Sequence, residues 1–244
     1  MIVIPMAGLS RRFTQAGYDK PKYMLSLGSE TVFDHAIGSF NRFFRSEPFL
    51  IIVRDVHGTP DFVEARSKAL GIRRARIVVL DGETAGQAET VVLGLAGGDC
   101  PIDAPATIFN IDTFRPDFAY PGEMWFARSD GYLEVFEGEG PNWSYVRPGH
   151  GSGVEPVVLE TAEKRPISNL CCTGLYHFAR ASDMLDAFAR ERVRPSASEL
   201  YLAPLYNHLI ARGARIHYRL IPRDAVQFCG VPEEYESLLD SGER

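Results

Sequence analysis

Short, continuous apolar runs alternate with helix-like segments through the first half of this chain. The apolar runs cover residues 1–5, 49–53, 76–80 and 106–110. The segments with helical periodicity lie between them, at residues 31–44, 61–70 and 88–96. Strands separated by helices need crossover connections, and runs that are apolar throughout are expected where helices cover both faces of a sheet. The pattern predicts an α/β fold, a three-layer, Rossmann-like arrangement around a mixed, mainly parallel sheet.

The second half of the chain is richer in strands. Further strands are predicted at residues 132–136, 157–160, 170–178 and 215–221, and helices at 181–192, 198–212 and 232–239. No internal repeat and no low-complexity linker divides the chain. We therefore expect one domain over residues 1–244, with halves of about 1–120 and about 121–244.

Composition excludes several classes of protein. The 45% hydrophobic content of this 244-residue chain is that of an ordinary globular protein, and no run of roughly 18 apolar residues could span a membrane. The N-terminus lacks the leading positive charge of a secretory signal, so a cytoplasmic location is expected. The four cysteines show no C-x-x-C spacing, which predicts reduced thiols and argues against a zinc site.

The charges are unevenly distributed. The net charge is −6, which argues against a general nucleic-acid surface. Residues 1–22 carry four basic residues against Asp19 alone, a local charge of +3, so the rest of the chain carries −9. A basic cluster on an acidic protein suggests a local site for a small anion such as phosphate.

The loop after the first strand carries the groups that such a site needs. Gly8 would let backbone N–H groups approach a phosphate, and Arg12 and Lys22 supply mobile positive charge. Pro21 stiffens the turn that presents Lys22. The loop matches neither the G-x-x-x-x-G-K-[ST] nor the G-x-G-x-x-G pattern, and a glycine turn with solvated basic residues is the alternative.

The loop resembles the signature of the nucleotidyltransferases that activate sugar phosphates, A-G-x-G-x-R-[FL] followed by P-K-x-L-x-x-[LI]-G. Here the two parts read AGLSRRF at residues 7–13 and PKYMLSLG at residues 21–28. Ser10 replaces the second glycine. The resemblance implies a nucleotide-diphospho-sugar transferase-like fold, in which residues 1–120 bind the nucleotide and residues 121–244 the acceptor. It identifies Arg12 and Lys22 as the catalytic arginine and lysine.

The resemblance extends to the following strand ends. Residues 81–88 are similar to the stretch that contacts the base, although Thr84 could instead cap a helix. Asp112, after the fourth strand, corresponds to the aspartate that holds Mg²⁺, and it is the third expected catalytic residue. The expected nucleotide-binding residues are Ala7, Gly8, Leu9, Ser10, Arg11, Arg12, Lys22, Thr84, Gly86 and Gln87.

The acceptor site is identified by three further similarities. Glu163 and Lys164 match an E-K pair, Gly174 lies in a stretch similar to S-T-G-x-Y-x-F, and Glu199 follows Ser198 at a predicted helix start. Without the family, the E-K pair would be solvated and Ser198 with Glu199 a helix cap. One part of the pattern fails, because Phe228 stands where many members have a second metal-binding aspartate. Asp224, four residues earlier, is a possible substitute.

The expected function is transfer of a nucleoside monophosphate from an NTP to a sugar 1-phosphate or similar small phosphate, with release of pyrophosphate. Surface-polysaccharide precursor synthesis is the expected setting. The expected partners are the NTP and the small phosphorylated acceptor, and a homo-oligomer is possible. The alternatives are a non-catalytic nucleotide sensor of the same fold and an enzyme for a non-sugar alcohol phosphate. The base, the acceptor and the oligomeric state stay open.

Overall fold

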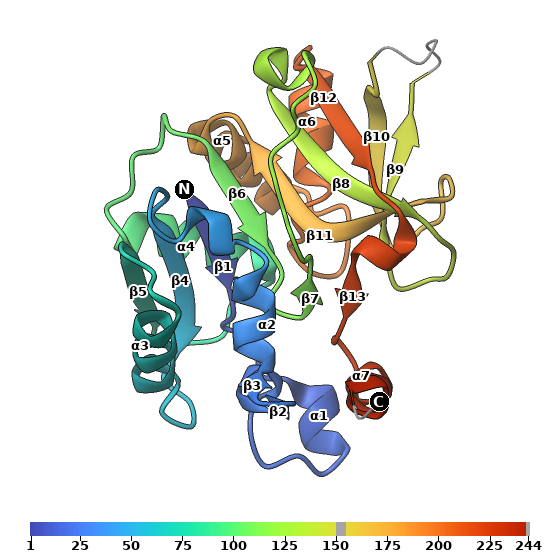
Figure 1. Ribbon diagram of the computed structural model, residues 1–244. Helices are drawn as coiled ribbons and strands as arrows, with labels where there is room; N and C mark the ends of the chain where they lie inside the picture. The colour runs from blue at the N-terminus through green and yellow to red at the C-terminus, as the bar shows by residue number, and fades with distance from the viewer. Residues whose placement is uncertain (150–154, 243–244) are drawn as a thin grey trace.

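The centre of the computed structural model, which describes residues 1–149 and 155–242, is a nine-stranded sheet. Its first half contains β1 (Ile2–Pro5), β4 (Phe49–Arg54), β5 (Ala75–Leu80) and β6 (Ala106–Phe109). These strands are parallel, in the order β5-β4-β1-β6 (Figure 1). The prediction of an α/β fold with parallel crossovers is confirmed.

Side chains along each strand point alternately to the two faces of the sheet, and this divides the interior into two hydrophobic cores. Val3 and Ile52 face a cluster formed with α4 (Gln87–Gly97), α5 (Ala181–Val193) and α6 (Leu205–Ala211). Their strand neighbours Ile2 and Ile51 face the opposite cluster, formed with α2 (Val32–Gly38) and α3 (Thr59–Leu70). Successive side chains of a strand point to opposite faces, so both faces of these strands must be apolar.

The second half of the chain extends the same sheet. The long strand β11 (Leu170–Phe178) runs antiparallel to β6 and to β8 (Gly131–Glu137), and it also contacts β9 (Ser144–Pro148). The outer strands are β10 (Val158–Glu163), which pairs with β9, and β12 (Ile216–Leu220), which pairs with β8. Every residue of β11 is buried, as expected for a central strand.

Two predicted helices are shorter than expected. The segment 31–44 forms α2 only as far as Gly38, followed by a short 3-10 turn at Asn41–Phe43. The helix predicted over residues 198–212 begins only at Leu205. Its first part is irregular because the backbone of Leu200 hydrogen-bonds to Ala85 and Ala88, in the loop and helix that follow β5. Glu199 is therefore not at a helix start.

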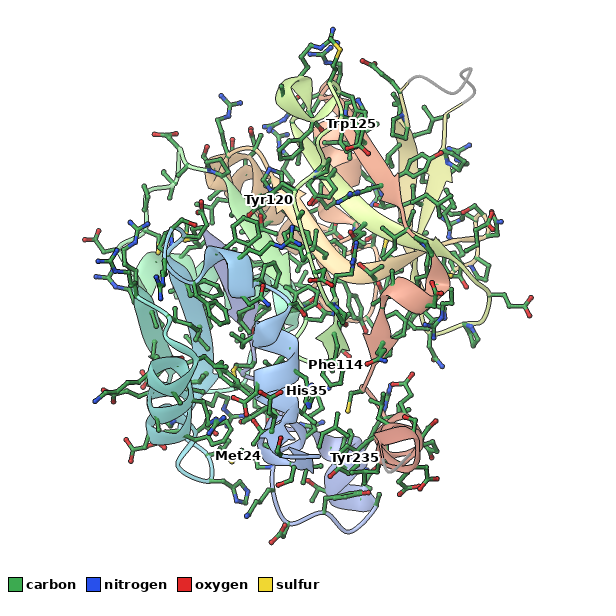
Figure 2. All side chains as sticks on the ribbon, in the orientation of Figure 1. Met24, His35, Phe114, Tyr120, Trp125 and Tyr235 are labelled. Atoms are coloured by element: carbon green, nitrogen blue, oxygen red, sulfur yellow. The ribbon has the colours of Figure 1, made fainter. Side chains whose placement is uncertain are left out.

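Small elements absent from the sequence prediction bring the C-terminus back to the N-terminal loop. The short strands β7 (Thr113–Phe114) and β13 (Gln227–Phe228) pair, and β2 (Ser26–Leu27) pairs with β3 (Glu30–Thr31). After β13, α7 (Pro232–Gly242) packs beside α1 (Arg11–Gln15), with the ring of Tyr235 against those of Phe13 and Tyr18 (Figures 1 and 2).

Candidate active site

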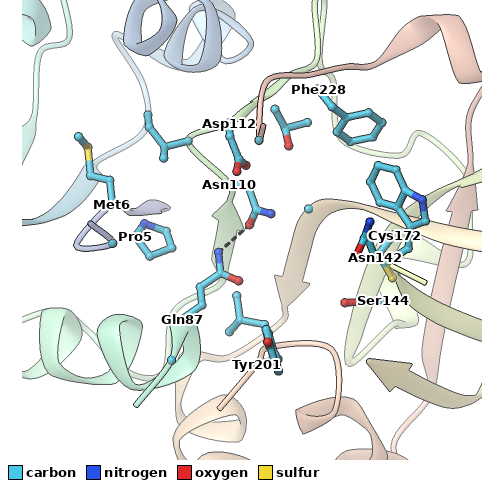
Figure 3. Close-up of a pocket in the computed structure, with 18 of the residues that line it drawn as sticks. Pro5, Met6, Gln87, Asn110, Asp112, Asn142, Ser144, Cys172, Tyr201 and Phe228 are labelled. Atoms are coloured by element: carbon cyan, nitrogen blue, oxygen red, sulfur yellow. Dashed lines mark hydrogen bonds between the residues drawn. The ribbon is translucent and has the colours of Figure 1, made fainter. Parts of the chain in front are cut away.

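A cavity of about 620 Å³ opens at the carboxyl ends of β1 and β6 (Figure 3). Open α/β sheets bind ligands at this edge, because the loops that leave parallel strands converge there. The acceptor half closes the cavity from the other side through β9, β11 and β13. The volume suits a nucleotide-sized ligand.

The N-terminal loop contributes Ala7, Gly8, Ser10, Arg12 and Lys22 to the cavity lining. Ser10 has a left-handed backbone, with φ of 50°, which explains why the family pattern has glycine at this position. Its Oγ accepts a hydrogen bond of 3.2 Å from the backbone N–H of Lys22. The hydroxyl thus ties together the two parts of the motif.

Leu9 and Arg11 do not line the cavity, although both were expected to bind the nucleotide. Arg11 instead forms an exposed ion pair of 3.0 Å with Glu83. It lies on the one-turn helix α1, where the side chains of Arg11 and Arg12 point in different directions.

Lys22 and Asp112 meet inside the cavity. Lys22 Nζ donates a hydrogen bond of 2.6 Å to Asp112 Oδ2, and both side chains are largely shielded from solvent. The two residues come from loops at neighbouring strand ends, after β1 and β6. Arg12 also lines this cavity, so all three expected catalytic residues share it.

The segment after β5 supplies Thr84, Gly86 and Gln87 to the lining, as the sequence predicts. Gln87 Nε2 donates a hydrogen bond of 2.6 Å to Asn110 Oδ1 (Figure 3). Thr84 is not the helix cap, because α4 begins after Gly86. A Cβ at Gly86 would lie 2.6 Å from the backbone N and O of Leu200, and its φ is 148°, so only glycine fits this contact.

The predicted acceptor residues reach the cavity to different degrees. Glu163, Gly174 and Glu199 line it. Lys164 does not, but its Nζ donates a hydrogen bond of 2.6 Å to the hydroxyl of Tyr201, which does line it. At Gly174, φ is 97° and a Cβ would lie 2.6 Å from Asn110 Nδ2, so glycine makes room for that amide.

Burial raises the pKa of the Glu163 carboxyl. A hydrogen bond from the Ser144 hydroxyl and the charge of Lys164 oppose the rise, whereas the charge of Glu199 adds to it. The pKa of the Lys164 ammonium is raised, chiefly by its bond to the Tyr201 hydroxyl and also by the charges of Glu163 and Glu199. The charges of Glu163, Lys164 and Glu199 therefore influence one another on the acceptor side of the cavity.

Several lining residues were not predicted. The most informative are Asn110, Asn142, Trp143, Ser144, Thr173, Tyr176, Tyr201 and Glu234. Asn110 lies two residues before Asp112 and Thr173 is next to Gly174, so both could have been found by extending the predicted segments by one or two residues. Trp143 and Glu234 carried no local signal, because their places depend on how β9 and α7 pack.

The donor groups fit a hard cation held by few protein ligands. Asp112 offers a carboxylate to the cavity, whereas Phe228 lines the wall without a donor atom and Asp224 is exposed outside it. A Cβ at Gly230 would lie 3.3 Å from Asp112 Oδ2 and 3.5 Å from Glu234 Oε2, so a small gap separates these carboxylates. No cluster of three or more acidic, His or Cys ligands occurs within residues 1–149 and 155–242. Mg²⁺ accepts such a site, because it commonly binds one or two carboxylates together with water and substrate phosphates.

Over the same described residues, no helix has the length and apolar character needed to cross a membrane. The four cysteines are free thiols, as predicted, and three of them are buried. Cys172 lines the cavity, and burial raises the pKa of its thiol well above the usual value.

Comparison with solved structures gives similarities that extend over nearly all of this chain. The crystal structure of a nucleoside-diphosphate-sugar pyrophosphorylase from Vibrio cholerae RC9 is 51% identical and covers 98% of this chain and 100% of that chain, with a TM-score of 0.93. A putative glucose-1-phosphate thymidylyltransferase from Bacillus anthracis shares the fold, with a TM-score of 0.75 and 18% identity over 98% of this chain and 93% of its own.

A shorter similarity links the chain to a curated enzyme. The 2-C-methyl-D-erythritol 4-phosphate cytidylyltransferase of Neisseria meningitidis serogroup C is 34% identical over 94 residues, which are 38% of this chain and 37% of that relative. The match thus spans little more than a third of either protein. No protein-family model matches the chain.

Proposed function

The chain belongs to the family of nucleoside-diphosphate-sugar pyrophosphorylases and sugar-phosphate nucleotidyltransferases, and we propose that it transfers a nucleoside monophosphate from an NTP to a small phosphate monoester. The observation that carries the proposal is the convergence of Arg12, Lys22 and Asp112 in one cavity. Two cations and a carboxylate at the end of a parallel sheet match the demands of a polyphosphate substrate with a divalent cation.

In the proposed reaction, a phosphate oxygen of the acceptor attacks the α-phosphorus of the NTP. A P–O bond forms there, the bond to the bridging oxygen of the β-phosphate breaks, and pyrophosphate leaves with that electron pair. A phosphate monoester is largely dianionic at neutral pH, since its second pKa is about 6. The nucleophile therefore needs no general base, and catalysis consists of positioning and neutralising charge.

In the proposal, different residues of the cavity position the substrates and neutralise their charge. Lys22 is placed to hold the α-phosphate, and the exposed side chain of Arg12 is free to follow the departing pyrophosphate. We assign the base contact to Gln87 and the backbone at Gly86, which line the cavity. Lys164, which is bonded to the lining residue Tyr201, is assigned to the incoming phosphate. Lys22 must exchange its bond with Asp112 for one with the nucleotide before the reaction.

We include Mg²⁺ in the proposal, with Asp112 as its protein ligand. When bound, the cation would neutralise charge on the phosphates. Glu234 is held by backbone N–H groups of Gly230 and Val231 through Oε2, which positions its carboxyl across the gap from Asp112.

We propose a sugar 1-phosphate or another alcohol phosphate as the acceptor, in the synthesis of a surface-polysaccharide precursor. Support for a sugar phosphate comes from the name of the 51%-identical Vibrio cholerae protein. Support for other alcohol phosphates comes from the matched segment of the erythritol-phosphate enzyme. The base is open among the common nucleotides.

The test is pyrophosphate release with Mg²⁺, measured for each common NTP against a panel of sugar and alcohol phosphates. We expect release that requires one NTP and one acceptor together. Tight NTP binding without release from any pair would contradict the proposal and support the non-catalytic sensor.

A further inference from the structure

The acceptor side of the cavity has an excess of carboxylates. Glu139, Glu163 and Glu199 line it there, whereas the lining cations of the described chain, Arg12 and Lys22, are at the nucleotide end. The nearby Lys164 is engaged by Tyr201, with its Nζ bonded to the hydroxyl and 4.8 Å from the ring centroid. The acceptor side therefore has three carboxylates and only the one nearby ammonium group of Lys164 among the described residues.

Two aromatic rings line the same cavity as these carboxylates and form what we call the aromatic wall. Trp143 and Phe228 are half-buried in the cavity lining, with ring centroids 4.6 Å apart and planes inclined by 56°. The guanidinium of Arg223 lies 4.9 Å from the ring centroid of Phe228 and 5.1 Å from that of Phe136. Aromatic rings attract cations through their negative faces, and the ring of Phe228 already has the cationic group of Arg223 near it.

A buried hydroxyl in the same region also lacks a partner. Thr173 is 2% exposed, lines the cavity, and its Oγ1 has no hydrogen-bond partner in the described structure. A buried hydroxyl without a partner is costly, so the site gains from a ligand that supplies one. Thr173 belongs to β11 in the acceptor half, and this observation is independent of the charges.

We propose that the acceptor is a phosphate monoester that also carries an ammonium group, which binds between the carboxylates of Glu163 and Glu199 and the aromatic wall of Trp143 and Phe228. The inference rests on the proposed nucleotidyl transfer and names its substrate class. Two sources share this chemistry, an amino-alcohol phosphate and an amino-sugar phosphate.

The charge balance favours a cation over a neutral polyol. Ligand entry removes water from the carboxylates, and hydroxyl groups of a neutral sugar would leave their mutual repulsion uncompensated. The repulsion is visible in the effect of Glu199 on the Glu163 carboxyl. An ammonium compensates both charges and gains a cation–π contact in the same place.

The test compares matched acceptors that differ in one charged group. Phosphoethanolamine is paired with 2-hydroxyethyl phosphate, and glucosamine 1-phosphate with glucose 1-phosphate. Calorimetry on the full-length protein gives the dissociation constant of each, and pyrophosphate release with each NTP gives turnover. We expect at least about 10-fold tighter binding of the amine in one pair, and the pair that shows it identifies the source.

Variants of single side chains test which residues cause the preference for the amine-bearing acceptor. Glu163→Gln and Trp143→Leu are each expected to reduce the amine preference to within about 3-fold. Glu160→Gln, on the same strand but paired with Arg147 and Arg165 and outside the cavity, is expected to keep it.

Equal or tighter binding of the neutral member in both pairs overturns the inference, even if pyrophosphate is released. An amine preference that Glu163→Gln leaves unchanged also overturns it, since the carboxylate would then play no part. Absence of release with every NTP contradicts the proposed transfer instead, and the binding constants still decide the inference.

Discussion

Lys22 Nζ lies 2.6 Å from Asp112 Oδ2, although 90 residues separate the two in the chain. The lysine expected to hold the α-phosphate and the carboxylate expected to hold Mg²⁺ therefore neutralise each other in the protein without ligands. Neither charge is left alone in a partly buried place, where it would be costly. Substrate and cation can replace this pair by taking one partner each.

Replacing Lys22 by Ala is expected to lower turnover by at least about 100-fold, the scale of losing one preorganised charge contact. The measurement is the rate of pyrophosphate release at saturating NTP and acceptor. The control is Lys20→Ala, because Lys20 lies on the other side of Pro21, is exposed, and does not line the cavity formed by the described residues. Near-normal turnover of the Lys22 variant would remove this residue from the mechanism.

Asp112→Asn should also reduce turnover by at least about 100-fold, because the amide keeps the shape but loses the charge that attracts a divalent cation. Manganese binding, followed by electron paramagnetic resonance, tests this without reference to activity. The comparison variant is Asp224→Asn, whose carboxylate is exposed outside the cavity. Equal manganese affinity in both variants would contradict the assignment of Asp112.

Gly86→Ala is expected to destabilise the protein by about 2 kcal/mol or more, because the new Cβ would meet the backbone of Leu200 at 2.6 Å. NTP affinity should fall as well, since the loop to which we assign the base contact would move. Gly82→Ala is the matched control, because a Cβ there meets nothing within 4 Å. Urea unfolding and NTP titration of both variants would show whether this contact matters.

Acid is expected to destabilise the fold through His177. Its ring is buried, with Nδ1 2.9 Å from Thr107 Oγ1, and burial lowers its pKa to about 3. The unfolded chain, with a pKa of about 6.5, binds the proton more readily, so stability is fully present above pH ~6.5 and falls as the pH drops towards 3. The slope is up to about 1.4 kcal/mol per pH unit.

Urea unfolding of the His177→Phe variant between pH 4 and 7 measures this contribution. The variant should lose much of the pH dependence, with a remainder from His217, whose pKa burial also lowers. Thr107 keeps its partner Tyr120 in that variant, and the exposed His57→Asn serves as the control. An unchanged pH slope in His177→Phe would refute the assignment.

The sequence determined the parallel half of the fold and the residues at its carboxyl edge. Apolar runs, helical periodicity and the motif around Arg12 and Lys22 are local signals, and the strand-end rule predicted that the loop after β1 would lie near Asp112. The strands, the helices and their meeting edge follow from backbone geometry within short segments, so one chain suffices to predict them. The roles of Arg12 and Lys22 were implied by the resemblance to a known family.

Tertiary packing alone decided the rest. Residues 198–204 are irregular because Leu200 pairs with the backbone of Ala85 and Ala88, a competition that helix periodicity cannot reveal. Likewise, the meeting of Trp143 with Phe228 depends on β13 pairing with β7, across more than 100 residues. Such contacts depend on which strands become neighbours, and this is set by the energy of the whole sheet rather than by any local pattern.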